Sequence, residues 1–391
     1  MPPADRPRWP VLALAGVAAF FVSFDGSVVI LALPAIASDF HASVPAIADL
    51  GSLFGLGTVA GLPIAMLADR QGRRRLLAIA VAGFSLANLG SALAPGFWWL
   101  AAVRTLAVTF ETVAGSVAVA LVVEEVASDW RGLAVAGLTV AGGAGTGLTT
   151  LLYPLVAPHW RWLYLGGSAG LVAAAVLGRW LPESRAWAAA RPERLPLALL
   201  FRPRWRSRLL VLAASAALSA VLYEPAGLLV AFFGSRHLGL GPAAISAVVV
   251  ASGLASVPAF LVGGRLSDRW GRRRLAVALS VATAVFAAAT FAGLAALYWA
   301  GNVLWSVLAS ATVPVVGAWA GELFPTRARA TSEAATSLAA AAGGVAGLQL
   351  VGLLQPRVGL GPALAATGAA ALAGALLLLR LPETRGEPLP S

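Results

Sequence analysis

Long apolar stretches alternate with short polar loops along the whole chain. Each stretch is close to or above the length of about 20 residues that a helix needs to cross a bilayer. A helix satisfies its own backbone hydrogen bonds inside lipid, so we interpret each stretch as a transmembrane helix. The pattern therefore predicts an all-α membrane protein with twelve transmembrane helices. The predicted spans cover 11–36, 46–67, 76–94, 97–123, 132–157, 160–180, 208–233, 242–266, 275–293, 295–320, 331–354 and 360–380.

Two polar loops recur in the second half of the chain. Segment 68–75 (Ala-Asp-Arg-Gln-Gly-Arg-Arg-Arg) returns as 267–274, and segment 181–185 (Leu-Pro-Glu-Ser-Arg) returns as 381–385. A shift of roughly 200 positions that holds for both pairs indicates an internal duplication. We therefore expect two related six-helix halves, 1–181 and 208–391, joined by a cytoplasmic linker at 182–207.

The composition excludes a soluble protein. Hydrophobic residues make up 59% of the chain and charged residues only 12%, whereas a soluble domain carries about 25% charged residues. All 28 basic residues are arginines, and they lie in short loops rather than in one patch, which argues against nucleic-acid binding despite the net charge of +11.

The arginines also predict the orientation. A cytoplasmic N-terminus places 24 of the 28 arginines in cytoplasmic segments and leaves only Arg161, Arg236 and Arg357 outside, with Arg104 inside the membrane. Cytoplasmic loops carry the excess of basic residues in membrane proteins. Both termini are therefore expected in the cytoplasm, with the protein in a plasma membrane such as the bacterial inner membrane.

Four charged residues lie within predicted spans and away from the ends of those spans: Asp25, Arg104, Glu111 and Glu224. Each costs at least about 2.5 kcal/mol at mid-membrane, so each should face a cavity or a partner. Arg104 and Glu111 are two helical turns apart, about 10 Å along the axis, which favours Asp25 as the partner of Arg104. The acids can serve proton coupling, brace helices as buried ion pairs, or bind a charged solute directly.

Other polar and aromatic side chains in the spans are weaker candidates for lining a substrate cavity. Their alternative roles are interhelical hydrogen bonds and anchoring at the membrane interface. They are Tyr223, Asn88, Asn302, Trp305 and Gln349. Glycine clusters at 137–147 and 343–347 favour close helix packing, and a bending point is the alternative.

These motifs resemble the major facilitator superfamily. The family's loop signature Gly-x-x-x-Asp-Arg-x-Gly-Arg-Arg matches 264–273 in full, while the first copy has Ala65 in place of the leading glycine. Segments 182–185, 382–385 and 321–327 resemble sugar and organic-ion porters. Asp25, segment 32–36 and Arg104 resemble drug/proton antiporters, although the Gln-Gly that usually follows the arginine is missing.

The resemblance implies the major facilitator fold, in which helices one, four and seven line a central cavity. It also implies a gating role for the repeated loops, whose network holds the cytoplasmic side closed while the transporter faces outward. The alternative is a charged turn that only sets topology. The implied gating residues are Asp69, Arg70, Gly72, Arg73, Asp268, Arg269, Gly271 and Arg272.

The expected function is secondary active transport of a small organic solute, a metabolite or organic ion, coupled to protons. A multidrug/proton antiporter is the alternative, and a non-transporting receptor is disfavoured by the short tail after Pro382. The sequence lacks a phosphate-binding loop and a His or Cys cluster with metal spacing, so no enzyme, cofactor or metal is expected. The two-half design needs one chain, so we expect a monomer in the bilayer.

The repeated loop generates a first prediction. Asp69→Asn should reduce transport while membrane insertion and expression stay normal, because the change removes one charge from the loop without altering any apolar span. Uptake assays in vesicles, normalised to the amount of inserted protein, measure this. Full activity at normal expression contradicts the gating role.

Overall fold

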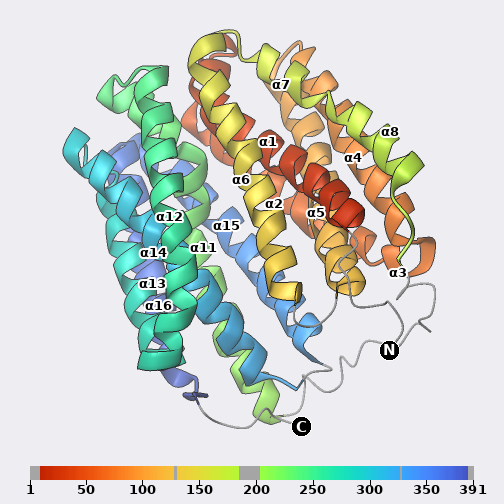
Figure 1. Ribbon diagram of the computed structural model, residues 1–391. Coiled ribbons are helices and arrows are strands. Elements are labelled where there is room, and N and C mark those ends of the chain that lie inside the picture. The colour runs from red at the N-terminus through yellow and green to blue at the C-terminus, as the bar shows by residue number, and fades with distance from the viewer. Residues whose placement is uncertain (1–8, 127–129, 185–202, 326–327, 386–391) are drawn as a thin grey trace. The chain divides into compact units, whose positions relative to one another are not determined.

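The computed structural model describes residues 9–126, 130–184, 203–325 and 328–385 (Figure 1). Within these ranges the chain is almost entirely helical and contains no strand. Most of the predicted linker falls on 185–202, outside the described residues. The side chains of Asp69 and Arg70 also lie outside them.

Contacts divide the chain into two units, and α2 contributes to both. The first unit comprises Met1–Ala42 and Leu56–Glu193, and the second comprises Ser43–Gly55 and Arg194–Ser391. The boundaries expected from the sequence, at 181 and 208, stay a prediction. The helices up to the end of the first unit are α1 (Trp9–Asp39), α2 (Val44–Ala65), α3 (Ala68–Gln71), α4 (Arg73–Ala92), α5 (Phe97–Glu125), α6 (Arg131–Val156), α7 (Arg161–Gly167) and α8 (Gly170–Trp180).

The second unit repeats the helix pairing of the first. In the first unit α1 packs on α6, and α4 packs on α5 and α8; in the second α11 packs on α15, and α13 packs on α14 and α16. The same order of partners in both units agrees with an internal duplication. The helices are α11 (Pro203–Leu238), α12 (Pro242–Trp270), α13 (Arg272–Ala289), α14 (Ala295–Leu323), α15 (Arg329–Val358) and α16 (Leu360–Leu377), followed by the short 3-10 helix η3 (Leu378–Arg380).

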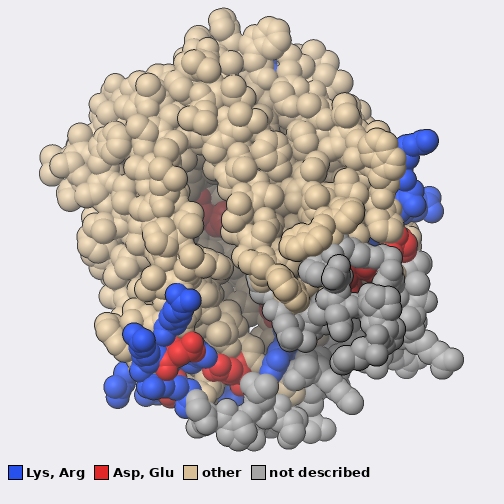
Figure 2. All heavy atoms as spheres, in the orientation of Figure 1, with Lys and Arg blue, Asp and Glu red and all other residues tan. Residues whose placement is uncertain are grey.

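Eleven spans among the described residues are long and apolar enough to cross a membrane. The segment 161–180, which holds α7 and α8, counts as one span, and the hydroxyl of Ser168 donates to the Leu165 carbonyl (2.6 Å) at their junction. The twelfth predicted span is α13, whose first three residues are arginines. Because of this polar start, α13 is not among the eleven helices that are long and apolar enough to cross a membrane. On the face drawn in Figure 2, charged side chains gather mainly where helices end, and the helix sides are mostly uncharged.

Each unit has its own apolar core. In the first, Leu77 and Phe84 of α4 are buried together with Leu121 of α5. In the second, Trp319 of α14 is fully buried beside Leu275 of α13, and its indole N–H donates to the Pro382 carbonyl (3.0 Å). The cores therefore join α4 and α13, the helices that follow the repeated loop, to their neighbours.

Glycine lets the most closely packed helix pairs meet backbone to backbone. A Cβ added at Gly145 of α6 would collide with the Phe20 carbonyl of α1. In the second unit, Gly343 and Gly347 of α15 meet the carbonyls of α11 in the same way. Gly145, Gly343 and Gly347 thus serve close packing, as expected where small residues form helix interfaces in lipid.

This contact generates a second prediction. Gly145→Ala should destabilise the first unit by about 1–3 kcal/mol, because the added methyl forces α1 and α6 apart. Gly147→Ala on the same helix is the matched control, since a Cβ there meets no atom within 4 Å. Thermal unfolding in detergent measures both, and equal stability of the two variants contradicts the packing argument.

Candidate functional site

A buried ion cluster lies in the first unit around Arg104 of α5. Its Nη1 donates to Oδ1 of Asp25 on α1 at 2.8 Å, and its Nη2 donates to Oε1 of Glu111 at 3.1 Å. The side chains of Arg104 and Asp25 are fully buried, and that of Glu111 is 12% exposed. One guanidinium thus contacts two carboxylates from two helices.

The Arg104–Glu111 contact corrects one expectation from the sequence. The axial separation of the two residues favoured Asp25 alone as the partner of Arg104, but Arg104 contacts both acids. The reason is the length of the two side chains, which together close two helical turns on one face of α5. Asp25 and Glu111 also lie close enough for their carboxyls to interact with each other.

Asn88 and Tyr164 complete the surroundings of Arg104. The side-chain oxygen of Asn88 on α4 accepts from Arg104 Nη1 at 3.1 Å, and the guanidinium lies over the Tyr164 ring of α7, 5.2 Å from its centroid. Both residues are buried. Asn88, a weak candidate for lining a cavity, therefore belongs to the ion cluster.

Several polar atoms of this cluster have no hydrogen-bond partner within the described part of the chain. They are Asp25 Oδ2, Asn88 Nδ2, Arg104 Nε and Tyr164 Oη. Unpaired buried polar groups are costly, so native proteins satisfy them with ordered water or a proton. A proton on the Glu111 carboxyl would offer Asp25 Oδ2 the donor that it lacks.

The charge balance explains what this cluster can do chemically. With both carboxyls ionised, the two negative charges exceed the single positive charge, and a net charge is left inside the helix bundle. An uncompensated buried charge is expensive, whereas one proton makes the cluster neutral. The arrangement can therefore hold and release one proton.

The second unit holds the remaining intramembrane acid and the aromatic candidates. Glu224 of α11 has an exposed side chain, and the absence of a Cβ at Gly344 of α15 leaves room for its methylenes. Next to it in sequence, Tyr223 stacks on Trp305 of α14, with ring centroids 6.2 Å apart and an interplanar angle of 17°. Asn302 accepts a hydrogen bond from Ser252 at 2.8 Å, which is the interhelical alternative considered for it.

Gln349 of α15 also makes hydrogen bonds within the second unit. Its amide nitrogen donates to Asp49 Oδ1 and to the Ser52 hydroxyl, each at 2.9 Å. Asp49 and Ser52 belong to the part of α2 that clusters with this unit. Gln349 therefore makes the hydrogen bonds between helices that were the alternative role considered for it, and it also lines a cavity of about 370 Å³ together with Asp49 and Arg357.

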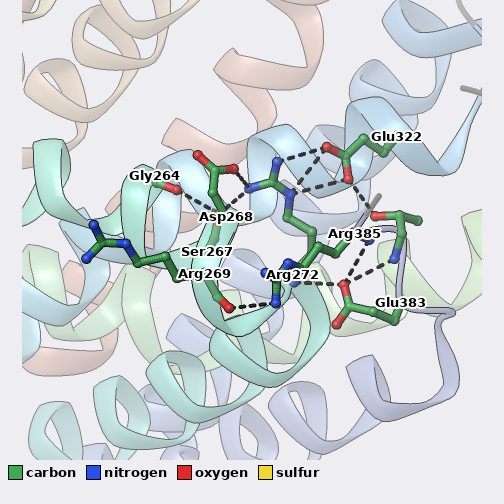
Figure 3. A network of polar contacts seen from close by, with 9 residues as sticks. Gly264, Ser267, Asp268, Arg269, Arg272, Glu322, Glu383 and Arg385 are labelled. Atoms are coloured by element: carbon green, nitrogen blue, oxygen red, sulfur yellow. Dashed lines mark hydrogen bonds and ion pairs between the residues drawn. The ribbon is translucent and has the colours of Figure 1, made fainter. Parts of the chain in front are cut away.

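The repeated loop of the second unit forms a dense polar network (Figure 3). The Arg272 side chain pairs with Asp268 (2.6 Å) and with Glu322 at the end of α14 (3.1 Å), and it also donates to the Ser267 hydroxyl. Arg269 contributes its carbonyl, which accepts from the Arg385 guanidinium at 2.6 Å. We call this group the second loop network.

Glu383 closes the same network at the start of α13. Its carboxylate accepts from the backbone N–H groups of Arg272 (2.8 Å), Arg273 (3.1 Å) and Arg385 (3.2 Å), and the Thr384 hydroxyl donates to Glu322 at 2.5 Å. A carboxylate at a helix N-terminus binds free N–H groups and the positive end of the dipole. Glu383 therefore anchors η3 and the chain after it to α13.

The first unit carries an equivalent network. Arg73 pairs with Glu124 at the end of α5 (2.7 Å), the Ser184 hydroxyl donates to Glu124 at 2.6 Å, and the Arg73 backbone N–H donates to Glu183 at 2.7 Å. Gly72 makes this arrangement possible, because its φ of +96° suits glycine and a Cβ there would collide with Glu183. Gly271 has the same role beside Glu383, with a φ of +93°.

Sequence reasoning gave no role at the helix starts to the two carboxylates that bind there, which are Glu383 and, in the first unit, Glu183. The partners Glu124 and Glu322 were missed altogether. The signal was available, since both pairs keep the offset of the repeated loops. All the described contacts of each network lie within one unit.

The pKa of Glu383 reflects these contacts. Partial burial acts to raise the pKa, but the N–H groups of Arg272, Arg385, Arg273 and Thr384 outweigh it and lower the pKa below the ordinary glutamate value. A lowered pKa in the folded state means that the ionised carboxylate stabilises the fold.

Helices of membrane-spanning length in both units, with an ionisable cluster inside the first, define a multi-pass membrane protein. Comparison with known proteins gives the family. The model of the Major Facilitator Superfamily matches residues 15–235 and 226–391, and the chain belongs to this superfamily.

Known relatives and solved structures agree with this assignment. The chain is 26% identical over 387 residues to a probable 4-methylmuconolactone transporter of Cupriavidus pinatubonensis, covering 93% of this chain and 88% of the relative. It is 32% identical over 184 residues to the multidrug efflux pump LfrA of Mycolicibacterium smegmatis, covering 45% and 36%. The fold matches that of a D-xylose–proton symporter with a TM-score of 0.78 at 16% identity, covering 97% and 99%.

The second loop network generates a third prediction. Glu383→Gln should lower the melting temperature at pH 7, because the amide cannot replace the charged acceptor of several backbone N–H groups. The stabilisation by Glu383 is present above the ordinary glutamate pKa of about 4.3 and is lost as the pH falls through the lowered folded-state pKa. The variant should therefore lose less stability than the wild type on acidification through that window.

Glu333→Gln is the matched control for this experiment, because Glu333 is an exposed glutamate on α15. Thermal melts in detergent between pH 7 and pH 3 compare the three proteins. Parallel curves for the wild type and Glu383→Gln would refute the anchoring role.

Proposed function

We propose that this protein couples transport of a small organic solute to proton movement through the Arg104 cluster. The observation that carries the proposal is the contact of one buried guanidinium with two carboxylates, Asp25 and Glu111. One proton is needed to make this cluster neutral. The net charge of the cluster therefore depends on whether water reaches it and can deliver or remove that proton.

The solute is a small organic acid or its lactone, moved by alternating access between two six-helix halves. This substrate class is supported by the similarity to a 4-methylmuconolactone transporter, which covers most of both chains. Protonation of the Arg104 cluster changes the affinity for the solute, and the solute changes the affinity for the proton by the same factor. Glu224 is the candidate for a solute contact in the second unit.

A multidrug/proton antiporter is the second candidate. It is supported by the similarity to the efflux pump LfrA and by Asp25 and Arg104, the two positions that resemble drug antiporters. In this case lipophilic cations would be exchanged for protons, and Glu224 would attract the cation. The two candidates differ in solute range and in the direction of proton movement.

The proposal places the protein in the bacterial inner membrane as a monomer with both termini in the cytoplasm. The distribution of arginines supports this orientation. The chain has no cysteine, so single cysteines introduced at the exposed positions 41 and 274 can be labelled with an impermeant maleimide from the side of the membrane that each one faces. Labelling of position 274 from outside the cell would reverse the orientation.

The fourth prediction tests proton coupling. Proteoliposomes with a trapped pH dye receive small organic acids, lactones, sugars or lipophilic cations. We expect a narrow group of organic acids to move protons in the wild type. Asp25→Asn or Glu111→Gln should abolish the signal, because each variant keeps only one carboxyl beside Arg104. Such a cluster cannot switch between a neutral, protonated state and a state with two ionised carboxylates.

Asp39→Asn is the matched control, since Asp39 is an acid of the first unit that pairs with Arg161 (2.6 Å) and has a side chain that is 44% exposed. Such a pair contributes only about 0–1 kcal/mol, so this variant should keep proton movement. A response to many unrelated lipophilic cations favours the antiporter. Solute transport without proton movement refutes the coupling proposal.

A further inference from the structure

An apolar groove runs along the outside of the first unit between α1 and α6. Its volume is about 530 Å³, and the end of α5 contributes to it. Apart from two indoles, every side chain that lines the groove is apolar. The largest lining side chains are Trp9, Leu12, Phe20, Trp130, Leu133 and Leu138.

The groove follows from the spacing of small residues on the two helices. Gly145 brings α6 against the Phe20 carbonyl of α1, and nearer the helix starts Gly16 and Gly137 present no side chain. A Cβ added at Gly137 meets no atom within 4 Å, so open space lies above it. The tight contact at one level and the missing side chains at the next leave an elongated hollow.

The mouth of the groove has the character of a membrane interface. Trp9 and Trp130 lie at the starts of α1 and α6, 61% and 43% exposed. Tryptophan is enriched where the bilayer meets water. In the sequence, Arg6 and Arg8 precede Trp9, and Arg131 follows Trp130, so basic residues accompany both indoles.

We infer that this groove binds one acyl chain of an anionic phospholipid, with the head group at the end marked by Trp9 and Trp130. The lining excludes a polar solute, because a binding site for such a solute needs converging polar groups and the groove has only two indole N–H groups. The basic residues next to both indoles complement a negative head group. The inference does not depend on the transport function.

Photochemical labelling of the intact protein tests this site. The wild type is placed in phosphatidylcholine nanodiscs that contain a trace of phosphatidylglycerol with a diazirine on its acyl chain. After irradiation, mass spectrometry locates the labelled peptides. We expect more label in the peptides 9–21 and 130–144 than in 251–262, an exposed apolar part of α12 that serves as the reference. Unlabelled phosphatidylglycerol should compete about fivefold better than phosphatidylcholine, the effect of about one basic residue.

Gly137→Leu should fill the hollow and remove most of this label. Gly143→Leu is the matched control on the same helix, because a Cβ there also meets nothing within 4 Å and Gly143 does not line the groove. Three results overturn the inference: label no stronger than in α12, equal competition by the two lipids, or label unchanged in Gly137→Leu. Protection by tetraphenylphosphonium to the same extent as by phosphatidylglycerol would also overturn it and assign the groove to lipophilic solutes.

Discussion

A guanidinium without access to water needs a compensating negative charge, and this requirement organises the first unit. Arg104 keeps its proton at any physiological pH, so its surroundings must adapt to it. Asp25 from α1 supplies one carboxylate, Glu111 from α5 supplies another, and Asn88 and Tyr164 add a hydrogen bond and an aromatic face. Four helices thereby acquire a common centre that none of them could bury alone.

The excess of acid over base at this centre connects stability to chemistry. A cluster with matched charges would only hold helices together. The second carboxylate instead makes the preferred charge state depend on whether water and protons reach the cluster, which is what a transporter that alternates between two sides can exploit. In the proposed function, structural bracing and proton coupling are two properties of one arrangement.

Much of this protein could be predicted from its sequence, because a bilayer imposes strong rules. Apolar length set the spans, and the repeated loops indicated two halves. The partner sets of single charges were harder to predict. Arg104 lies two turns from Glu111, and only the reach of both side chains closes that gap. Glu124 and Glu322 were overlooked because each ends a long apolar helix, where an acid is ordinary.

The repeated loops also show what repetition can and cannot reveal. The offset between 68–75 and 267–274 pointed to equivalent places in the two halves, and the networks there are indeed equivalent in their described parts. Glu183 and Glu383 bind the helix starts, while Asp268 pairs with the side chain of Arg272. A motif identifies a location reliably, whereas the pairing of its charges depends on neighbours distant in sequence.

Because the described contacts of each loop network lie within one unit, we expect the ends of the helices that it ties together to keep their spacing during the proposed alternating access. Arg73 holds α4 to the end of α5, and Arg272 holds α13 to the end of α14. A chain without cysteine accepts spin labels only where they are introduced. The distance between spin labels on α4 and α5 therefore supplies a constant reference, with which any distance that changes during a transport cycle can be compared.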